Sequence, residues 1–279
     1  MRLISTAKRI LALLKRTYVN VTIAQIVHGQ ILKDKHIVIT GGSRGLGLAM
    51  AKKFISEGAT VLITGHNQDN LNKAMADIAS NRLHTVLFDS NDIDGIPAFV
   101  TSCFDKFGTV DALVSNAGIS LHETGITDVT TNGFDKTIAT NLKSHYFMSK
   151  SYIEQKIKEY GQTGNLLFIT SKDGYVCGEI PYPLTKAAIN SLVGGLSAHY
   201  YRKGIRVNAI APGVTITDMT SSYAKKADGN MSAENYAGRH FLPEEVAEVA
   251  AFLLSDASKC ISGQIIFTDG GSHIKSNIK

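Results

Sequence analysis

Three stretches of the sequence place a tyrosine four residues before a lysine, a spacing that could support proton transfer. The pairs are Tyr182–Lys186, Tyr146–Lys150 and Tyr152–Lys156. On a helix, residues four apart lie on the same face. A neighbouring ammonium group stabilises a phenolate and lowers the phenol pKa from about 10, which makes tyrosine usable as an acid and base. Spacing alone does not distinguish the three pairs, so the surrounding elements must decide.

The elements expected around these pairs are those of an α/β protein. From Asp34 onward, strand-like runs alternate with helical patterns, and a chain of 279 residues with 44% hydrophobic composition can bury one full core. This alternation predicts a Rossmann-type, doubly wound parallel sheet with helices on both faces. We expect an extension over residues 1–33 and a single domain over residues 34–279. The predicted strands lie at 36–40, 60–64, 84–88, 111–115, 165–170, 205–210 and 264–268.

Position in such a fold separates Tyr182 from the other two tyrosines. In a doubly wound sheet, ligands bind outside the carboxyl ends of the strands. Ser171 stands at one predicted strand end, and Tyr182 follows eleven residues later at the start of a helical pattern. Tyr146 and Tyr152 lie within one long helical stretch, about residues 133–160, where a tyrosine more often packs in the core and a lysine more often lies on the solvated face. The sequence therefore favours Tyr182 and Lys186 as the reactive pair.

The first predicted strand runs into the glycine-rich stretch TGGSRGLG, residues 40–47, and a helical pattern follows at once. Glycines there permit a tight turn and close approach of the backbone to a pyrophosphate, which the start of the helix would hold through its N–H groups and dipole. Such a turn can be a plain connection, but its place between the first strand and the first helix favours dinucleotide binding. The expected contacts are Gly41, Ser43, Arg44, Gly45, Leu46 and Gly47.

The end of the second predicted strand indicates which dinucleotide binds. An acidic residue there would accept hydrogen bonds from the adenosine ribose of NAD and would repel a 2′-phosphate. This chain has Gly65 and His66 at that place, and Arg44 can approach the same ribose. Because a guanidinium group can hold a phosphate through two hydrogen bonds, we predict NADP(H) in preference to NAD(H). The alternative is that Arg44 is a solvated loop cation and His66 a turn residue.

Eight fragments of the sequence, in this order, resemble the short-chain dehydrogenase/reductase family. They are TGGSRGLG (40–47), SNAG (115–118), TNLKSHY (140–146), GNLLFITS (164–171), YPLTK (182–186), RVNAIAPG (206–213), PEEVAEVAAFLLSD (243–256) and SGQIIFTDGG (262–271). The chain looks most like members that reduce 3-oxoacyl thioesters on acyl carrier protein. It departs from the family pattern in two places: the segment from Ser171 to Tyr182 is shorter than in many members, and SNAG replaces the commoner Asn-Asn start.

The resemblance implies a catalytic set of Ser171, Tyr182, Lys186 and Asn141. Tyr182 would protonate the alkoxide that forms when hydride reaches a carbonyl carbon, while Lys186 would lower the tyrosine pKa and hold the nicotinamide ribose. Ser171 would hydrogen-bond the carbonyl oxygen. Asn141 would position a water that relays protons toward Lys186. Without the resemblance, Asn141 would be interpreted as a polar residue on a helix surface.

The resemblance also implies further cofactor contacts, among them Asn116, and a substrate region. For Asn116 the alternative is a purely structural role, in which its side chain only ties strand ends together. Substrate specificity would lie mainly in residues 214–241, a polar stretch expected to act as a mobile lid. We expect a 3-oxoacyl thioester or a related ketone, with sugars and polyols as alternatives. The implied cofactor contacts are Asp89 on the adenine side, Asn116, Ala117 and Gly118 after the fourth strand, and Pro212, Gly213 and Thr217 beside the nicotinamide.

Positive charge is concentrated at the N-terminus. The chain carries a net charge of +5, but residues 1–33 hold six Lys or Arg and no acid, which leaves 23 basic against 24 acidic residues elsewhere. A nucleic-acid surface on the main domain is therefore not expected. Residues 1–18 predict a basic amphipathic helix, too short and too charged to span a bilayer. It could lie on anionic lipid, pack on its own domain or a sister subunit, or be an organelle transit peptide.

Cysteine and histidine usage argues against metal and disulfide chemistry. Three widely spaced cysteines form no Cys-x-x-Cys motif, and nine histidines show no ligand spacing. We expect no catalytic metal and a reducing, cytoplasmic location. Family analogy adds a homo-dimer or homo-tetramer. The alternative function is a non-catalytic dinucleotide-binding scaffold docked through its N-terminal arm, although the presence of Ser171, Tyr182 and Lys186 together argues against it.

Overall fold

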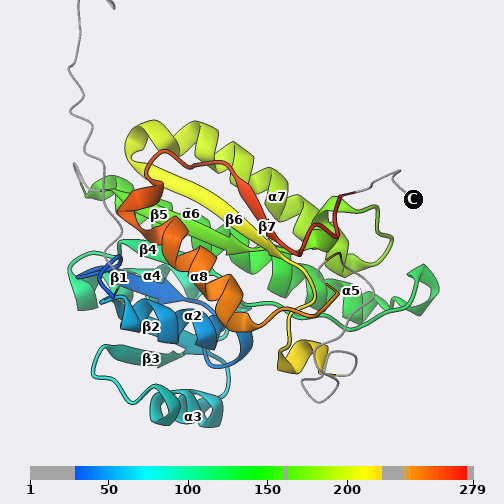
Figure 1. Ribbon diagram of the computed structural model, residues 1–279, viewed down its shortest axis with the longest axis horizontal. Coiled ribbons are helices and arrows are strands. Elements are labelled where there is room, and N and C mark those ends of the chain that lie inside the picture. The colour runs from blue at the N-terminus through cyan, green and yellow to red at the C-terminus, as the bar shows by residue number, and fades with distance from the viewer. Residues whose placement is uncertain (1–28, 160–162, 222–235, 237, 275–279) are drawn as a thin grey trace, which may run out of the picture.

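The structure, a computed structural model, describes residues 29–159, 163–221, 236 and 238–274 (Figure 1). Two expectations from the sequence fall at least partly outside this range. The predicted amphipathic helix at 1–18 lies wholly outside the described residues. Of the predicted lid at 214–241, residues 222–235 and 237 also lie outside them.

Within the described residues, a seven-stranded sheet forms the middle layer, in the order β3-β2-β1-β4-β5-β6-β7. Every neighbouring pair of strands is parallel. This confirms the predicted doubly wound fold, and each predicted strand overlaps an observed one. The strands are β1 (His36–Ile39), β2 (Thr60–Gly65), β3 (Leu83–Leu87), β4 (Ala112–Ser115), β5 (Gly164–Ile169), β6 (Ile205–Pro212) and β7 (Ile265–Thr268).

Helices cover both faces of the sheet, as Figure 1 shows. On one face α2 packs against α8, and on the other α4 packs against α6. Alternate residues of β1 supply the two cores, because Ile37 and Ile39 point into the first and Val38 into the second. The helices are α2 (Gly45–Ser56), α3 (Gln68–Ile78), α4 (Ile96–Phe107), α5 (Thr131–Ile138), α6 (Ser144–Lys158), α7 (Pro181–Tyr200) and α8 (Pro243–Leu254).

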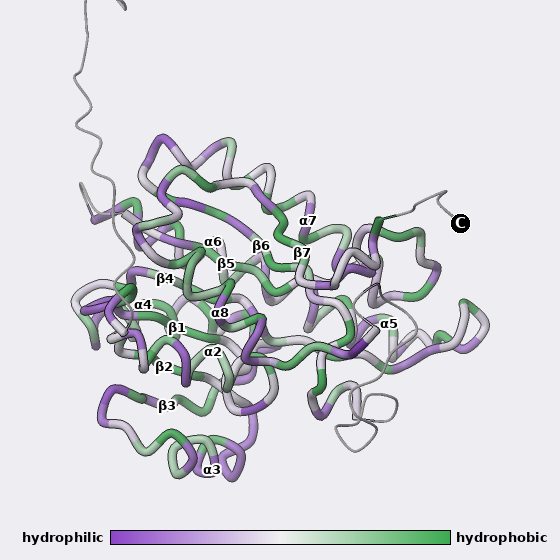
Figure 2. Tube along the Cα trace, viewed as in Figure 1, coloured by the Kyte–Doolittle hydropathy of each residue, from purple (hydrophilic) through white to green (hydrophobic). Residues whose placement is uncertain are grey.

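The strands are apolar because they are buried on both faces. All six residues of β5 and seven of the eight residues of β6 are buried, and Figure 2 shows the middle of the molecule mainly in green. Such continuous apolar runs are typical of parallel sheets between two helical layers. The chain runs outward from β1 to β3 and then returns to β4 beside β1. This reversal opens a crevice at the carboxyl ends of β1 and β4.

The helical stretch predicted around residues 133–160 is divided in the structure. α5 begins after Thr130, whose side chain accepts a hydrogen bond from the N–H of Gly133. A π-helical stretch, Ala139–Lys143, then joins α5 to α6. Such stretches often occur at functional positions, and this one carries Asn141. The short 3₁₀ helices are η1 (Ile126–Asp128), η3 (Lys172–Tyr175), η4 (Tyr201–Lys203), η5 (Asp218–Thr220) and η7 (Asp256–Ser258).

The described chain begins close to the core. Leu32 is fully buried, and its N–H donates to the carbonyl of Glu57 at 3.0 Å. Ile31 packs beside it as a partly buried residue. No helix of the described ranges has both the length and the apolar character needed to cross a bilayer.

Candidate active site

A cavity of about 580 Å³ lies at the carboxyl ends of the strands, the end toward which the arrows point in Figure 1. Its walls come mainly from the segments that follow β1 to β6, and its volume is that of an ordinary ligand pocket. Two of the predicted site residues, Gly47 and Asn141, do not line it. Those that do are Gly41, Ser43, Arg44, Gly45, Leu46, His66, Asp89, Asn116, Ala117, Gly118, Ser171, Tyr182, Lys186, Pro212, Gly213 and Thr217.

The glycine-rich loop requires glycine for conformation and for space. Gly41 and Gly45 have φ values of +65° and +55°, which disfavour other residues. A Cβ on Gly41 would stand 2.9 Å from the Cα of Ala117, and one on Gly47 would stand 2.4 Å from the carbonyl oxygen of Gly41. α2 begins at Gly45 without a side-chain cap or an acidic residue in its first turn. Its first N–H groups are therefore suited to hold an anion.

Asn116 ties two segments of the wall together. Its side-chain amide donates to the carbonyls of Thr40 and Gly41, both at 3.0 Å. The N–H groups of Asn116 and Ala117 both donate to the Thr40 hydroxyl, at 3.0 and 3.2 Å. The contacts therefore fit the structural alternative for its side chain, which fixes the end of β4 against the glycine-rich loop.

The rim of the cavity beyond β1 carries a cation. Arg44 is largely exposed, and its Nη1 lies 3.5 Å from Oδ2 of Asp218, on η5. His66 is exposed on the rim beyond β2. Asp89, beyond β3, accepts a hydrogen bond from the N–H of Asn91 at 2.9 Å. The end of β2 thus carries no acidic side chain that would repel a phosphate.

Tyr182 and Lys186 lie one helical turn apart at the start of α7, in the cavity wall. The Lys186 Nζ stands 5.5 Å from the centroid of the Tyr182 ring. The Lys186 side chain is buried, and its Nζ donates to the carbonyl of Ile169 at 3.0 Å. Burial lowers the pKa of Lys186 to about 8, so the ammonium form still predominates at neutral pH. The site therefore holds a buried cation beside a phenol.

The other two Tyr–Lys pairs lie away from this cavity. Tyr146 is half exposed on α6, and Lys150 forms a surface ion pair. Tyr152 is buried, and its hydroxyl donates to two backbone carbonyls at 3.1 and 3.3 Å. Burial raises its pKa, because desolvation disfavours the phenolate. Lys156 pairs with Glu159 at 2.6 Å, so the buried residues Tyr152 and Lys156 serve the packing of the domain.

Ser171 follows β5 and caps η3. Its Oγ accepts a hydrogen bond from the N–H of Asp173 at 3.1 Å. A hydroxyl that accepts one hydrogen bond can still donate its own proton. Ser171 and Tyr182 both line the same cavity.

Asn141 is fully buried behind the wall. Its side chain forms two hydrogen bonds with the backbone of Ile119, donating to the carbonyl and accepting from the N–H, both at 2.8 Å. The surface position considered from the sequence is therefore wrong. Asn141 holds the segment after β4 against the π-helical stretch.

Several residues that the sequence did not indicate also line the cavity, among them Asn91, Lys136 and Thr140. The Thr140 hydroxyl donates to Oδ1 of Asn91 at 3.1 Å. The rule that ligands lie beyond the strand ends could have indicated Asn91, after β3. Lys136 and Thr140 carry no such signal, because the packing of α5 and the π-helical stretch against α7 decides their position.

The described residues hold no group of three His, Cys, Asp or Glu side chains able to bind a metal ion. Cys103 is buried, which raises its pKa to about 12, whereas Cys177 and Cys260 are exposed. None of the three lines the cavity.

Comparison with known proteins now assigns the family. A family model described as enoyl-(acyl carrier protein) reductase matches residues 41–273. The chain belongs to the short-chain dehydrogenase/reductase family. It is 34% identical over 252 residues to an L-rhamnose 1-dehydrogenase (NADP(+)) of Thermoplasma acidophilum, covering 86% of this chain and 96% of the relative. It is also 34% identical over 246 residues to a 3-oxoacyl-[acyl-carrier-protein] reductase of Chlamydia trachomatis, covering 86% and 98%.

Solved structures of this family share the fold. A 3-ketoacyl-(acyl-carrier-protein) reductase from Brucella melitensis, complexed with NADH, superposes with a TM-score of 0.78 at 29% identity, covering 87% of this chain and 100% of that chain. Levodione reductase superposes with a TM-score of 0.79 at 27% identity, covering 86% and 98%. As a short-chain dehydrogenase/reductase, the protein is an oxidoreductase of CH–OH and carbonyl groups that uses a nicotinamide dinucleotide. The glycine cradle, the uncapped start of α2 and the buried Lys186 fit that cofactor.

Proposed function

We propose that this protein is an NADP(H)-dependent enzyme that interconverts a ketone and a secondary alcohol, with a 3-oxoacyl thioester or a related ketone as substrate. The observation that carries the proposal is the placement of Tyr182, Lys186 and Ser171 in the wall of the glycine-lined cavity. The bound nicotinamide supplies or accepts the hydride. The chain must bind and orient the substrate and move one proton.

The proton step belongs to Tyr182. As the carbonyl oxygen gains negative charge, the phenol donates its proton to that oxygen, and the Ser171 hydroxyl donates a hydrogen bond to it. The buried Lys186 ammonium stabilises the phenolate left behind. In the oxidative direction, the same phenolate removes the alcohol proton. Asn141 acts behind this group, where the segment it fixes supports a water relay toward Lys186.

The proposed cofactor contacts are supported by the places of most of these residues along the cavity. The loop from Gly41 to Gly47 and the start of α2 bind the pyrophosphate, and Lys186 binds the nicotinamide ribose. Asp89 borders the adenine side, and the wall from Asn116 to Gly118 bounds the cofactor crevice after β4. Pro212, Gly213 and Thr217 border the nicotinamide.

The preference for NADP(H) rests on Arg44. Its ion pair with Asp218 is exposed on both sides, and such pairs contribute little, so a 2′-phosphate can take the place of the carboxylate. We expect Arg44→Ala to raise the dissociation constant of NADPH by about ten- to a hundredfold, the usual effect of losing charge-assisted hydrogen bonds, while that of NADH changes less than about threefold. Fluorescence titration of both dinucleotides measures this. An equal loss for both would contradict the assignment of Arg44 to the 2′-phosphate.

The activity is tested by following NADPH oxidation with a panel of ketones, sugars and acetoacetyl thioesters. We expect turnover of at least one thioester or ketone, and a loss of about a thousandfold in Tyr182→Phe with cofactor affinity kept. Tyr152→Phe, in the buried pair outside the cavity, is the matched control. If wild type and Tyr182→Phe bind NADPH but are equally inert across the panel, the scaffold alternative is favoured.

We further propose that residues 34–279 act as the catalytic unit of a cytoplasmic homo-oligomer, and that the basic segment 1–18 attaches it to anionic lipid or to a sister subunit. The support is the segregation of apolar and basic residues in that segment. Removal of residues 1–28 should leave NADPH binding intact. It should reduce co-sedimentation with phosphatidylserine vesicles or change the gel-filtration volume. No change in either measurement would remove both roles.

A further inference from the structure

A buried histidine contacts the cavity wall from behind and has no place in the proton step above. His145 lies on α6, four residues after Asn141, and is 1% exposed. Its Nδ1 stands 2.9 Å from the Ser115 hydroxyl, and its Nε2 stands 2.6 Å from the carbonyl oxygen of Ala117. Asn141 also hydrogen-bonds this segment, through the backbone N–H and carbonyl of Ile119. Two neighbouring side chains thus hold one segment, residues 115–119, at several points.

The two partners fix the tautomer of the neutral imidazole. The carbonyl of Ala117 can only accept, so Nε2 carries the hydrogen, and in the neutral ring Nδ1 accepts the Ser115 hydroxyl proton. Burial, and then the positive charge of Lys186, lower the pKa of His145 to about 3. Because it stays neutral in the working range, His145 cannot act as an acid or base there and can act only by holding the wall.

The segment that His145 holds meets the cofactor crevice with little spare room. Gly41 approaches so closely that a Cβ there would stand 2.9 Å from the Cα of Ala117. A Cβ on Gly118 would stand 3.4 Å from Oδ1 of Asn141 and 3.7 Å from the Lys186 Nζ. A shift of this segment by a few tenths of an ångström would therefore alter the space beside both the glycine-rich loop and Lys186.

We propose that Ser115 and His145 form a neutral hydrogen-bonded clamp that sets the position of residues 115–118 against the glycine-rich loop. They are positioning residues for the dinucleotide, and the inference rests on the proposed function of the cavity. The clamp explains why a serine stands at the first position of the SNAG motif in this chain. The hydroxyl of Ser115, at the end of β4, and the Nδ1 of His145, on α6, are both buried, and each provides the hydrogen-bond partner of the other.

Four single variants separate the clamp from simple core packing. His145→Phe keeps a ring beside Phe168, which lies 6.2 Å away and nearly parallel, but removes both nitrogens. His145→Gln keeps a donor for the Ala117 carbonyl. Ser115→Ala removes only the hydroxyl, and Ser115→Thr keeps it. The readout is the NADPH dissociation constant, measured without substrate, together with thermal unfolding of each variant.

We expect His145→Phe to raise the NADPH dissociation constant about tenfold and Ser115→Ala about threefold, as losses of buried hydrogen bonds do. His145→Gln and Ser115→Thr should stay within about threefold of wild type. Adding Ser115→Ala to His145→Phe should cause little further loss, since the partner is already absent. At saturating NADPH, kcat should change less than the dissociation constant in every variant.

Wild-type affinity for NADPH in His145→Phe and Ser115→Ala, whatever their thermal stability, would overturn the clamp and leave His145 as a core residue. Should His145→Phe fail to fold, Ser115→Ala decides alone, because it changes volume least and unchanged affinity in it overturns the proposal. If the wild-type protein bound neither NADPH nor NADH, the proposed function itself would be contradicted. If the wild-type protein bound NADPH and the variants bound it equally well, only the clamp would be contradicted.

Discussion

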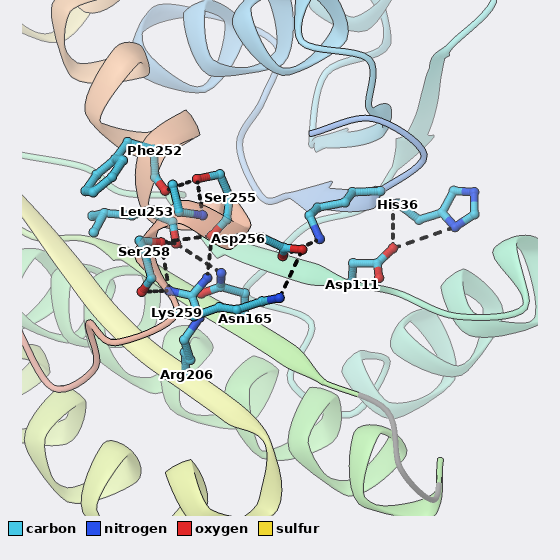
Figure 3. Close-up of polar contacts among 12 residues, drawn as sticks. His36, Asp111, Asn165, Arg206, Phe252, Leu253, Ser255, Asp256, Ser258 and Lys259 are labelled. Atoms are coloured by element: carbon cyan, nitrogen blue, oxygen red, sulfur yellow. Dashed lines mark hydrogen bonds and ion pairs between the residues drawn. The ribbon is translucent and has the colours of Figure 1, made fainter. Parts of the chain in front are cut away.

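The two ends of the sheet use similar charged residues for different purposes. At the amino ends, Arg206 at the start of β6 donates from Nη1 to the carbonyl and hydroxyl of Ser258, both at 3.0 Å, and from Nη2 to the carbonyl of Ser255 at 3.1 Å (Figure 3). Lys35 and Lys259 both pair with Asp256, at 3.2 and 3.3 Å. At the carboxyl ends, Lys186 is buried and, within the described chain, forms no ion pair with a carboxylate.

Each end of the sheet has a cavity, so the presence of a cavity does not distinguish the two ends. The amino-end cavity measures about 230 Å³ and is lined by Lys35, Arg206, Asp256 and Lys259, whose charges neutralise one another or bind carbonyls. The carboxyl-end cavity is larger, and it combines a buried ammonium with uncapped N–H groups of α2. The paired charges at the amino ends stabilise the fold. A buried charge such as Lys186, which has no carboxylate partner within the described residues, shifts the pKa values of neighbouring groups, and catalytic sites depend on such shifts.

Lys186→Met gives the largest expected effect and tests the carboxyl end. Activity should fall by about a thousandfold, because Tyr182 loses the cation that stabilises its phenolate. The free energy of unfolding at pH 7 should rise by about 1–3 kcal/mol, because a desolvated cation is removed. Since the folded pKa of about 8 lies below the unfolded value of 10.5, this gain is full below pH 8 and is lost as the pH rises toward 10.5.

Urea unfolding at pH 7 and at pH 10.5 measures this difference. Lys150→Met, at the exposed lysine of α6, serves as the control and should change neither stability nor activity appreciably. A Lys186→Met variant less stable than wild type at pH 7 would show that Lys186 supports the fold as Arg206 does, and the contrast between the two ends would fail.

Arg206→Met gives the next effect, on stability alone. Its removal takes one donor from each of three carbonyls, those of Ser255, Ser258 and Ile261, although each keeps a second donor. The free energy of unfolding should therefore fall by about 1–3 kcal/mol. The value of kcat/KM for the folded enzyme should stay within about twofold. Arg206→Lys keeps the charge but not the fork of donors and should recover only part of the loss. A large fall in kcat/KM at a temperature where the variant is folded would mean that the two ends are coupled.

Lys259→Ala gives the smallest effect, because its ion pair is exposed, at 59% for the lysine and 51% for Asp256. The free energy of unfolding should change by less than about 0.5 kcal/mol, and molar salt should erase the difference. Lys35→Ala, which removes the other partner of Asp256, is the comparison. A loss above about 1 kcal/mol in either variant would show that the amino-end charges act as a cooperative network.

Local patterns and their order along the chain were sufficient for the frame of the site. The apolar runs predicted all seven strands, and the alternation with helices predicted a parallel sheet. The parallel sheet in turn placed the turn at 40–47, Ser171 and Tyr182 at one edge. Tyr182 was separated from Tyr146 and Tyr152 by its place after a strand end. These conclusions depend on near neighbours and on chain order, which a sequence displays directly.

Contacts between distant segments were decided only by the tertiary structure. The sequence left open whether Asn116 ties strands and whether Asn141 is exposed; the fold gives Asn116 two carbonyl partners and buries Asn141 completely. Lys156 and Lys186 have the same spacing from a tyrosine. Lys156 is neutralised by Glu159, whereas Lys186 forms no ion pair with a carboxylate in the part of the chain that the structure describes. The surroundings of a side chain depend on residues tens of positions away in the chain. The sequence therefore determined where in the fold the candidate site residues lie, and only the tertiary packing decided which of them are fixed by hydrogen bonds, which form ion pairs and which keep an unpaired charge within the described residues.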